Sequence, residues 1–479
     1  MDRLVRKDVP FREIIPVALL NRLALSCACG LNSRCGGSGS IYRKPRAKRQ
    51  GVELAGTDEL FVILVAPNVS EHMGGEAIKA LQICLELERA GVRVHQITHE
   101  RVKGELSKNF PDMHVSYVAD SRLQVMLDRI RPLSPLLGVI FLWHATRMAR
   151  KLAAEHPGAV IHFTAPVSPI LPYFRMKGNR VVIGPLNGNI HYPKSFRSVE
   201  PLGYKIRRWT HPILQKVLQF GPRGKQNADV LLNSGGARTY KSLRMCGCRD
   251  SQIVDSIDSG VLDRLYKSPR IAHSGVNLRF FQNGRLVCHK GADLVIKALK
   301  LTANPVEFEL IGRGDQLEGL KALTAELGLE KRVHFIEWVP DHSKLSDKLR
   351  SYRALVFPSL AEANGIVVQE AMVLGLPVIA LNWGGPAALV TKETGVLIEP
   401  ESEEHVVREL ARAMDLLSQD GELADRMAIA ARERALRGGF LWPGIVEDFI
   451  RLYRRISGRG DVKAQEAAEA ETASRVSSE

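Results

Sequence analysis

A regular alternation of apolar strands and amphipathic helices is the feature that most restricts the fold of this chain. Phe61–Val65 is a continuous apolar run, typical of a strand buried on both faces, and a helical pattern over 76–90 leads to the next strand at 92–97. The alternation continues to residue 232, stops in a polar stretch at 255–273 and then restarts with a strand expected at 278–282. Strands that alternate with helices form parallel β-α-β units. We therefore predict an α/β protein with two doubly wound, Rossmann-like domains that face a central cleft.

The same patterns set the expected domain boundaries. We expect a flexible basic leader at 1–57, an N-terminal Rossmann-like domain at 58–265 and a C-terminal Rossmann-like domain at 270–440. A terminal crossover helix is expected at 441–457. The tail at 458–479 has no core-forming residues, and we expect it to be disordered.

Composition narrows the classes of protein to consider. Lysine and arginine exceed aspartate and glutamate by 67 − 52 = 15, which favours anionic partners such as phosphates or a membrane surface. Aromatic residues make up only 6%, so no nucleic-acid partner is expected. Seven cysteines form neither a disulfide framework nor a zinc motif with C-x2-C spacing. We expect a reduced, cytoplasmic protein without a metal site or a transmembrane segment.

The most informative stretch starts where an apolar strand ends: a loop carries Glu362, and Gly365 opens a helix. Ligands of open α/β sheets bind beyond the carboxyl ends of strands, and the N–H groups of Ile366 and Val367 at a helix start would suit a phosphate. Glu362 and Glu370 would repel that phosphate unless each accepts hydrogen bonds from hydroxyls. This combination indicates a ligand with phosphate in the middle and polyols at both ends, as in a nucleotide sugar.

A second loop, after the first strand of the C-terminal domain, carries Arg285 and Lys290. The chain has no D-x-D pair, so a divalent cation held by carboxylates is not indicated. Two fixed cations would neutralise a leaving diphosphate instead. We therefore expect no cofactor and a nucleotide sugar as co-substrate. A dinucleotide-binding oxidoreductase is disfavoured because Gly312-Arg313-Gly314 lacks the third glycine of the fingerprint.

Residues 278–400 resemble the retaining nucleotide-sugar glycosyltransferases of family 4 (group 1 type), which have the GT-B fold. The resemblance rests on an ordered set of motifs: Gly284-Arg285…Lys290-Gly291, Leu310-Ile311-Gly312-Arg313-Gly314-Asp315, Lys331-Arg332-Val333-His334-Phe335, Glu362 and Glu370 as an E-x7-E pair, and Gly375-x-Pro377-Val378-Ile379-Ala380. It implies that Arg285 and Lys290 bind the diphosphate. It also implies that Glu362 contacts the hydroxyls of the donor sugar and that Glu370 holds the ribose, with Asn364 and Gly365 in the same substrate-binding loop.

The resemblance also implies that 270–440 is the nucleotide-sugar-binding domain and that 58–265 is the acceptor-side domain. The N-terminal domain supplies three further expectations. Gly74 and Gly75 resemble the family's glycine loop, where the backbone approaches donor and acceptor; a plain turn between strand and helix is the alternative. His162 lies at a strand end that we expect to face the cleft, with a catalytic or positioning role. Many relatives carry a second histidine where this chain has Thr164. The loop at 183–189 resembles one that lines the acceptor side.

The resemblance implies transfer of a sugar from a nucleotide-sugar donor to a glycan or lipid-linked glycan acceptor in polysaccharide biosynthesis. The transfer would retain the anomeric configuration and need no metal. A nucleotide-sugar epimerase and a non-catalytic scaffold of the same fold are the alternatives. A scaffold has less reason to keep the complete set of Arg285, Lys290, Glu362 and Glu370.

The segment 204–225 combines basic residues with an apolar, aromatic face. Such a helix can lie on an anionic membrane, and it can equally cover the first domain with its charges in water. We therefore expect a cytoplasmic protein that can contact the inner face of the plasma membrane peripherally.

Overall fold

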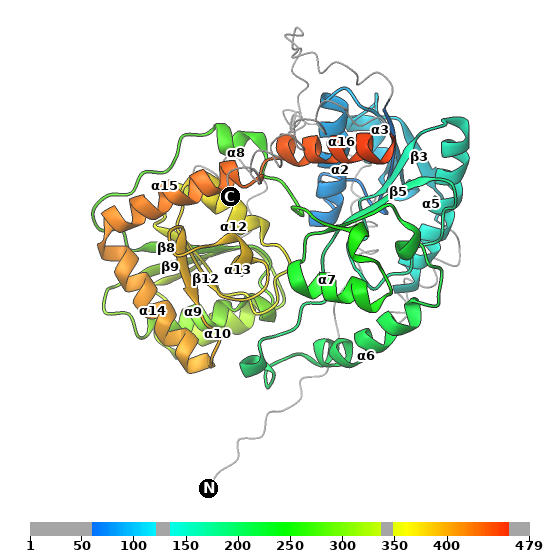
Figure 1. Cartoon of the computed structure of the whole chain (residues 1–479). Coiled ribbons are helices and arrows are strands. Elements are labelled where there is room, and N and C mark those ends of the chain that lie inside the picture. The colour runs from blue at the N-terminus through cyan, green and yellow to red at the C-terminus, as the bar shows by residue number, and fades with distance from the viewer. Residues whose placement is uncertain (1–59, 121–134, 337–347, 459–479) are drawn as a thin grey trace, which may run out of the picture. The chain divides into compact units, whose positions relative to one another are not determined.

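The computed structural model describes residues 60–120, 135–336 and 348–458 (Figure 1). The expected leader at 1–57 lies outside the described residues, and so does the expected tail apart from Gly458.

The N-terminal lobe is built on a parallel sheet of seven strands in the order β3-β2-β1-β4-β5-β6-β7. The strands are β1 (Phe61–Val65), β2 (Arg93–His99), β3 (Val115–Val118), β4 (Val160–Phe163), β5 (Arg180–Leu186), β6 (Val230–Asn233) and β7 (Ile253–Asp255). Its helices are α2 (Gly75–Arg89), α3 (Lys103–Asn109), α5 (Pro135–Glu155), α6 (Leu202–Leu218) and α7 (Gly236–Met245). A short helix, α8 (Asp263–Lys267), lies between the two sheets in the sequence.

The C-terminal lobe is built on a parallel sheet of six strands in the order β10-β9-β8-β11-β12-β13. The strands are β8 (Arg279–Asn283), β9 (Glu307–Ile311), β10 (Val333–Ile336), β11 (Ala354–Phe357), β12 (Val378–Leu381) and β13 (Gly395–Ile398). Its helices are α9 (Ala292–Leu299), α10 (Leu317–Glu326), α12 (Ile366–Leu374), α13 (Pro386–Leu389), α14 (Glu403–Gln419) and α15 (Gly421–Arg437). Because every strand pairs in parallel, the carboxyl ends of β8 and β11 lie side by side.

The last described helix, α16 (Trp442–Ile456), returns to the N-terminal lobe and lies beside α2 (Figure 1). Its apolar face joins the core under the first sheet: Phe449 and Tyr453 pack with Val160 and Val182 of β4 and β5. A helix contributed by the far end of the chain therefore completes the core of the first lobe. None of the helices in the described part of the chain is long and apolar enough to cross a membrane.

The predicted alternation is observed, with three differences. The sequence analysis missed β3, because its short Val-Ser-Tyr-Val segment lies at the sheet edge and is only half-buried over three of its four residues. It missed β7, which ends at the start of the polar stretch. The first strand of the second sheet also begins and ends one residue later than the predicted 278–282. Edge and boundary positions depend on pairing rather than on local apolar pattern.

Candidate active site

Lys290 and Glu362 form an ion pair at the carboxyl edge of the second sheet. Lys290 ends a short turn after β8, and Glu362 lies in the loop after β11, so the pairing of these strands brings the two side chains together. The ammonium also lies 4.9 Å from the ring centroid of Phe357, the last residue of β11. The side chains are only 15% and 16% exposed. The two charges are thus partly desolvated. A phosphate could bind the ammonium of Lys290, and sugar hydroxyls could bind the carboxylate of Glu362.

Arg285 adds a second, exposed cation to this edge. It lies in the same loop as Lys290, and its charge acts on His289 and Tyr204. The pKa of His289 falls to about 4, first because of burial and then because of the neighbouring Lys290 ammonium. His289 is therefore neutral near pH 7. Burial raises the pKa of the Tyr204 hydroxyl, so that group stays protonated and can donate a hydrogen bond.

The start of α12 supplies N–H groups near the Lys290–Glu362 pair. Gly365 has φ 90°, a left-handed conformation that favours glycine, and its carbonyl accepts from the N–H groups of Val368 and Gln369. The first N–H groups of a helix have no acceptor within it, which leaves those of Ile366 and Val367 for another partner. The structure thus brings Arg285, Lys290, Glu362 and this helix start to one edge of the sheet.

Glu370 has a different environment, although it follows in the second turn of α12. Burial raises its pKa to about 7, and the charge of Arg264 in α8 offsets part of that increase. The charged group that acts on Glu370 is thus Arg264, rather than Lys290 or Arg285. The structure does not bring Glu370 into contact with the Lys290–Glu362 pair.

The glycine loop of the first lobe lies between β1 and α2. Gly74 has φ 91°, and Gly75 is the first residue of α2. Both are exposed, and a Cβ at either position would meet no described atom within 4 Å. The positive φ of residue 74 therefore favours glycine there, and no neighbouring atom excludes a side chain. The open backbone is compatible with the approach of a ligand.

The prediction that His162 faces the cleft is wrong. Its side chain is fully buried; its Nδ1 lies 2.6 Å from the hydroxyl of Tyr453, and its Nε2 lies 2.8 Å from the carbonyl oxygen of Gly184. The ring also packs edge-on against Phe449, so it points to the sheet face that α16 covers. Successive side chains of a strand point to opposite faces, and the sequence could not indicate which helix covers which face. His162 therefore holds α16 on the first lobe.

We expect His162 to make the protein less stable in acid. Burial lowers its pKa to about 4, whereas the unfolded chain has the ordinary value of 6.5, so the unfolded state binds more protons as pH falls from 6.5 to about 4. The free energy of unfolding then decreases by about 3 kcal/mol from this group, at ~1.4 kcal/mol per unit of pKa difference. Denaturant unfolding of wild type and His162→Gln, measured from pH 7.5 to 4.5, should give a shallower pH dependence in the variant.

His334→Gln is the matched control, because His334 is exposed. Its pH profile should follow that of the wild type. Parallel profiles for wild type and His162→Gln would contradict the assignment of a neutral, buried His162.

The sequence analysis missed Arg238, which reaches from the first lobe to the donor loop of the second. Its guanidinium donates to the carbonyl oxygen of Ala363 at 2.8 Å and contacts Oδ1 of Asn187 at 3.3 Å. It follows Ser234-Gly235-Gly236 at the end of β6. This glycine pair between a strand and a helix was the sequence feature that could have indicated a functional loop here. Arg238 thus touches the residue next to Glu362 from the opposite lobe.

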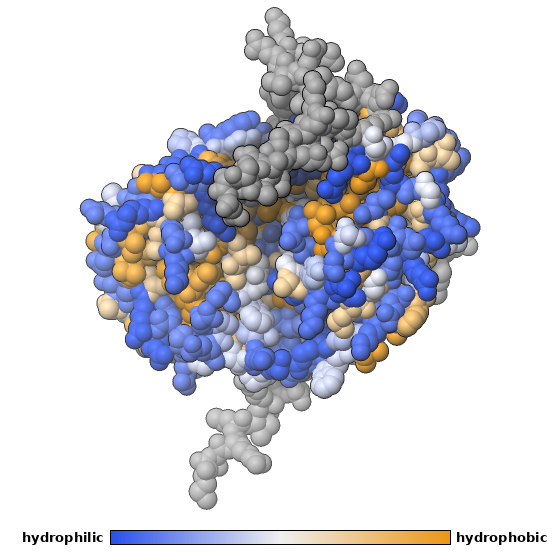
Figure 2. Space-filling view, in the orientation of Figure 1, coloured by the Kyte–Doolittle hydropathy of each residue, from blue (hydrophilic) through white to orange (hydrophobic). Residues whose placement is uncertain are grey.

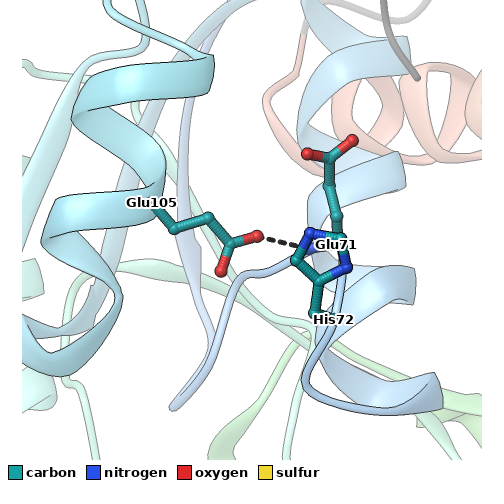
Figure 3. Close-up of side chains that lie close together, drawn as sticks. All are labelled: Glu71, His72 and Glu105. Atoms are coloured by element: carbon teal, nitrogen blue, oxygen red, sulfur yellow. Dashed lines mark hydrogen bonds between the residues drawn. The ribbon is translucent and has the colours of Figure 1, made fainter. Parts of the chain in front are cut away.

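The described residues include a single group with three potential metal ligands close together: Glu71, His72 and Glu105 (Figure 3). The carboxylate of Glu105 already accepts hydrogen bonds from the Ser70 hydroxyl and the Glu71 N–H, both at 2.7 Å. Glu71 accepts from Asn109 at 2.9 Å. These bonds join the loop after β1 to α3, and they account for the cluster without a metal ion.

The C-terminal lobe is similar to proteins of a known family. Residues 270–434 match the family described as Glycosyl transferases group 1. The C-terminal lobe is therefore similar to group 1 glycosyltransferases. An uncharacterised glycosyltransferase of Haemophilus influenzae is 32% identical over 154 residues, covering 31% of this chain and 42% of that protein. The lipopolysaccharide core biosynthesis glycosyltransferase LpsD of Rhizobium meliloti is 32% identical over 172 residues, covering 36% of this chain and 48% of LpsD.

The chain thus spans less than half the length of these curated relatives. A solved structure extends the likeness to both lobes: Anabaena HepE, in complex with UDP and glucose, superposes with a TM-score of 0.56 over 82% of this chain and 98% of HepE. Sequence identity is 18%, so this likeness concerns the fold. With the two parallel sheets, it confirms the predicted GT-B architecture.

Proposed function

We propose that the protein is a glycosyltransferase that moves a sugar from a nucleotide-sugar donor to a glycan acceptor. The observation that carries this proposal is the Lys290–Glu362 ion pair beside Arg285, within the lobe that matches the group 1 family. Cationic groups suit a diphosphate, and a carboxylate suits sugar hydroxyls. HepE is bound to UDP and glucose in its structure, and we propose a UDP-sugar as the first donor to test.

The proposed mechanism retains the anomeric configuration, as in family 4. Arg285, Lys290 and the helix start at Ile366 would stabilise the negative charge on the leaving diphosphate. The acceptor hydroxyl would attack the anomeric carbon on the face from which the diphosphate leaves, and a phosphate oxygen would take its proton. Because two fixed side-chain cations neutralise the leaving group and the sequence lacks a D-x-D pair, we propose that transfer needs no metal ion.

Thermal unfolding with a panel of UDP-, GDP- and ADP-sugars tests the donor proposal. A true donor binds the folded state and should raise the Tm, with an increase that grows as the logarithm of its concentration above Kd, both with EDTA and with Mg²⁺. NMR of the product should then give the same anomeric configuration as the donor. Loss of the shift in EDTA would overturn metal independence, and an inverted product would overturn retention. Epimerised donor without any acceptor would favour the epimerase instead.

We further propose that α6 attaches the protein peripherally to an anionic membrane surface. Figure 2 shows a few hydrophobic residues among hydrophilic ones at the lower right, where α6 lies in Figure 1. Five large apolar side chains of α6 recur every three or four residues and form one stripe along the helix, and Phe220 continues this spacing two residues after the helix ends. Each is exposed over more than half of its surface: Leu202, Ile206, Trp209, Ile213, Val217 and Phe220. At about 100° per residue, Lys205 and Lys216 border one side of the stripe and Arg207 lies beyond the other.

The opposite side of α6 is fixed to the protein. Gln215 is fully buried and donates to the Ser242 hydroxyl of α7 at 2.5 Å. The apolar stripe therefore faces away from the lobe, and its basic borders complement anionic headgroups. LpsD is named for lipopolysaccharide core biosynthesis, and this supports a lipid-linked glycan as the acceptor at the inner face of a membrane.

A further inference from the structure

A hollow of about 510 Å³ lies at the amino edge of the C-terminal sheet. Arg279, the first residue of β8, lines it, and so does Arg353, which directly precedes β11. The Lys290–Glu362 pair lies beyond the other ends of these two strands. At ~3.3 Å per residue, strands of this length separate the two edges of the sheet by about 15 Å. The hollow is therefore a separate place from the candidate active site.

The wall of this hollow combines basic side chains with an absence of acidic ones. Arg279, Arg350 and Arg353 line it, and none of the described residues of the wall is an aspartate or a glutamate. The volume falls in the range of ~300–1,000 Å³ that is typical of small-ligand sites. Size and charge together suit a small anion.

Arg350 supplies a cation that no described carboxylate pairs with. Its Nη1 and Nη2 both donate to the carbonyl oxygen of Pro269, each at 3.2 Å, in a solvent-exposed position. A carbonyl oxygen carries only a partial charge, and these two bonds engage only some of the five N–H groups of a guanidinium. The other N–H groups of Arg350 therefore remain for an anion.

Arg279 adds a second accessible cation. Its guanidinium pairs with Glu309 of β9, and the ammonium of Lys348 lies 2.8 Å from the same carboxylate. Two cations thus share one ion-pair partner. The side chain of Arg279 is 39% exposed, so a ligand in the hollow can reach it.

Arg353 contributes through its charge rather than by contact. Its side chain is fully buried, and its Nη2 donates to the carbonyl oxygens of Ser274 and Gly275. Asp420 is the carboxylate whose charge acts on it. Buried arginines are uncommon, because desolvation of the charge is costly. A buried guanidinium beside the hollow raises the electrostatic potential there.

The carboxylates near this edge do not balance the cations. The described groups that ion pairs and charge interactions connect here are the cations Arg270, Arg279, Lys348, Arg350, Arg353 and Arg432 and the carboxylates Glu307, Glu309, Asp420 and Asp425. The excess of cations gives the hollow a positive potential, and such a potential attracts anions.

We propose that this hollow binds a soluble phosphate ester, with Arg350 and Arg279 contacting the phosphate group. A planar guanidinium matches two phosphate oxygens at once, which makes arginine well suited to phosphate recognition. The hollow has room for more than a phosphate, and the polar residues Ser274, Asn277 and Ser351 in its wall suit the hydroxyls of the ester. This site goes beyond glycosyl transfer and does not depend on the donor site.

Arg350→Gln tests the proposal, because the substitution removes a positive charge without breaking an ion pair between described residues. Calorimetric titration with ribose 5-phosphate should detect binding to the wild type. The affinity should fall at least about tenfold in Arg350→Gln and in Arg279→Gln, since each loses a charge-assisted contact. Raised salt should weaken binding to the wild type, and neutral ribose should not bind. Thermal unfolding would verify that both variants are folded.

Two further variants locate the bound phosphate. Arg412→Gln is the matched control, because Arg412 is an exposed arginine of α14 in the same lobe and lies outside the hollow. It should bind ribose 5-phosphate as the wild type does. Lys290→Ala should also keep the wild-type affinity, because Lys290 lies at the other edge of the sheet.

Three results would overturn the proposal: no binding of ribose 5-phosphate to the wild type, undiminished affinity in Arg350→Gln, or loss of binding in Lys290→Ala. A lipid phosphate, dihexanoyl phosphatidic acid, distinguishes the source of the phosphate. It should bind less tightly than ribose 5-phosphate, and tighter binding of the lipid would overturn the assignment to a soluble ester.

Discussion

Replacing Lys290 with alanine is expected to reduce kcat for glycosyl transfer by about two to three orders of magnitude. Removal of one preorganised group that stabilises charge in the transition state typically costs ~10²–10³ in kcat. The substitution also leaves the carboxylate of Glu362 without its ion-pair partner in a partly buried site. Steady-state kinetics with the donor identified in the nucleotide-sugar panel would measure the effect. Glu362→Gln, which keeps the shape but removes the charge, should cause a comparable loss.

Lys297→Ala provides the control. Lys297 lies in α9 of the same lobe and is also ion-paired, with Asp293 and Glu403, but it lies outside the candidate active site. Exposed ion pairs contribute little, so this variant should keep its activity within about twofold of the wild type. A kcat for Lys290→Ala close to that of Lys297→Ala, with both proteins folded, would contradict the assignment of the donor site.

The double substitution Trp209→Ser with Phe220→Ser is expected to weaken binding to anionic vesicles by about two orders of magnitude. Full burial of one large apolar side chain contributes ~1.5–3 kcal/mol, so loss of two contacts with the bilayer has a large effect. Co-sedimentation with vesicles of phosphatidylglycerol and phosphatidylcholine at low salt would measure it. Raised salt should weaken the wild type too, because the basic borders of α6 are screened.

Leu416→Ser is the matched control, because Leu416 is a half-exposed apolar residue of α14 in the other lobe. It should co-sediment as the wild type does. A wild-type protein that stays in the supernatant at low salt would refute membrane attachment. Undiminished binding of the double variant would show that α6 is not the contact.

Much of this protein could be predicted from local sequence patterns. The run at Phe61–Val65 identifies a buried strand because its residues are apolar without alternation. Lys290 and Glu362 could be paired because each follows a strand of one parallel sheet, and the carboxyl ends of such strands share an edge. The positions of short edge strands such as β3 were beyond this reasoning, since little of their surface is buried.

Contacts between distant parts of the chain decided the rest. His162 and Tyr453 are 291 positions apart, and only the return of α16 to the first lobe makes His162 a core residue instead of a cleft residue. Arg238 and Ala363 meet from different lobes. Apolar periodicity encodes that a face is buried, but it does not encode which distant element buries it. The sequence by itself thus determined most of the elements, the sheet edge and the charged pair, whereas packing between distant segments decided where His162 and Arg238 lie.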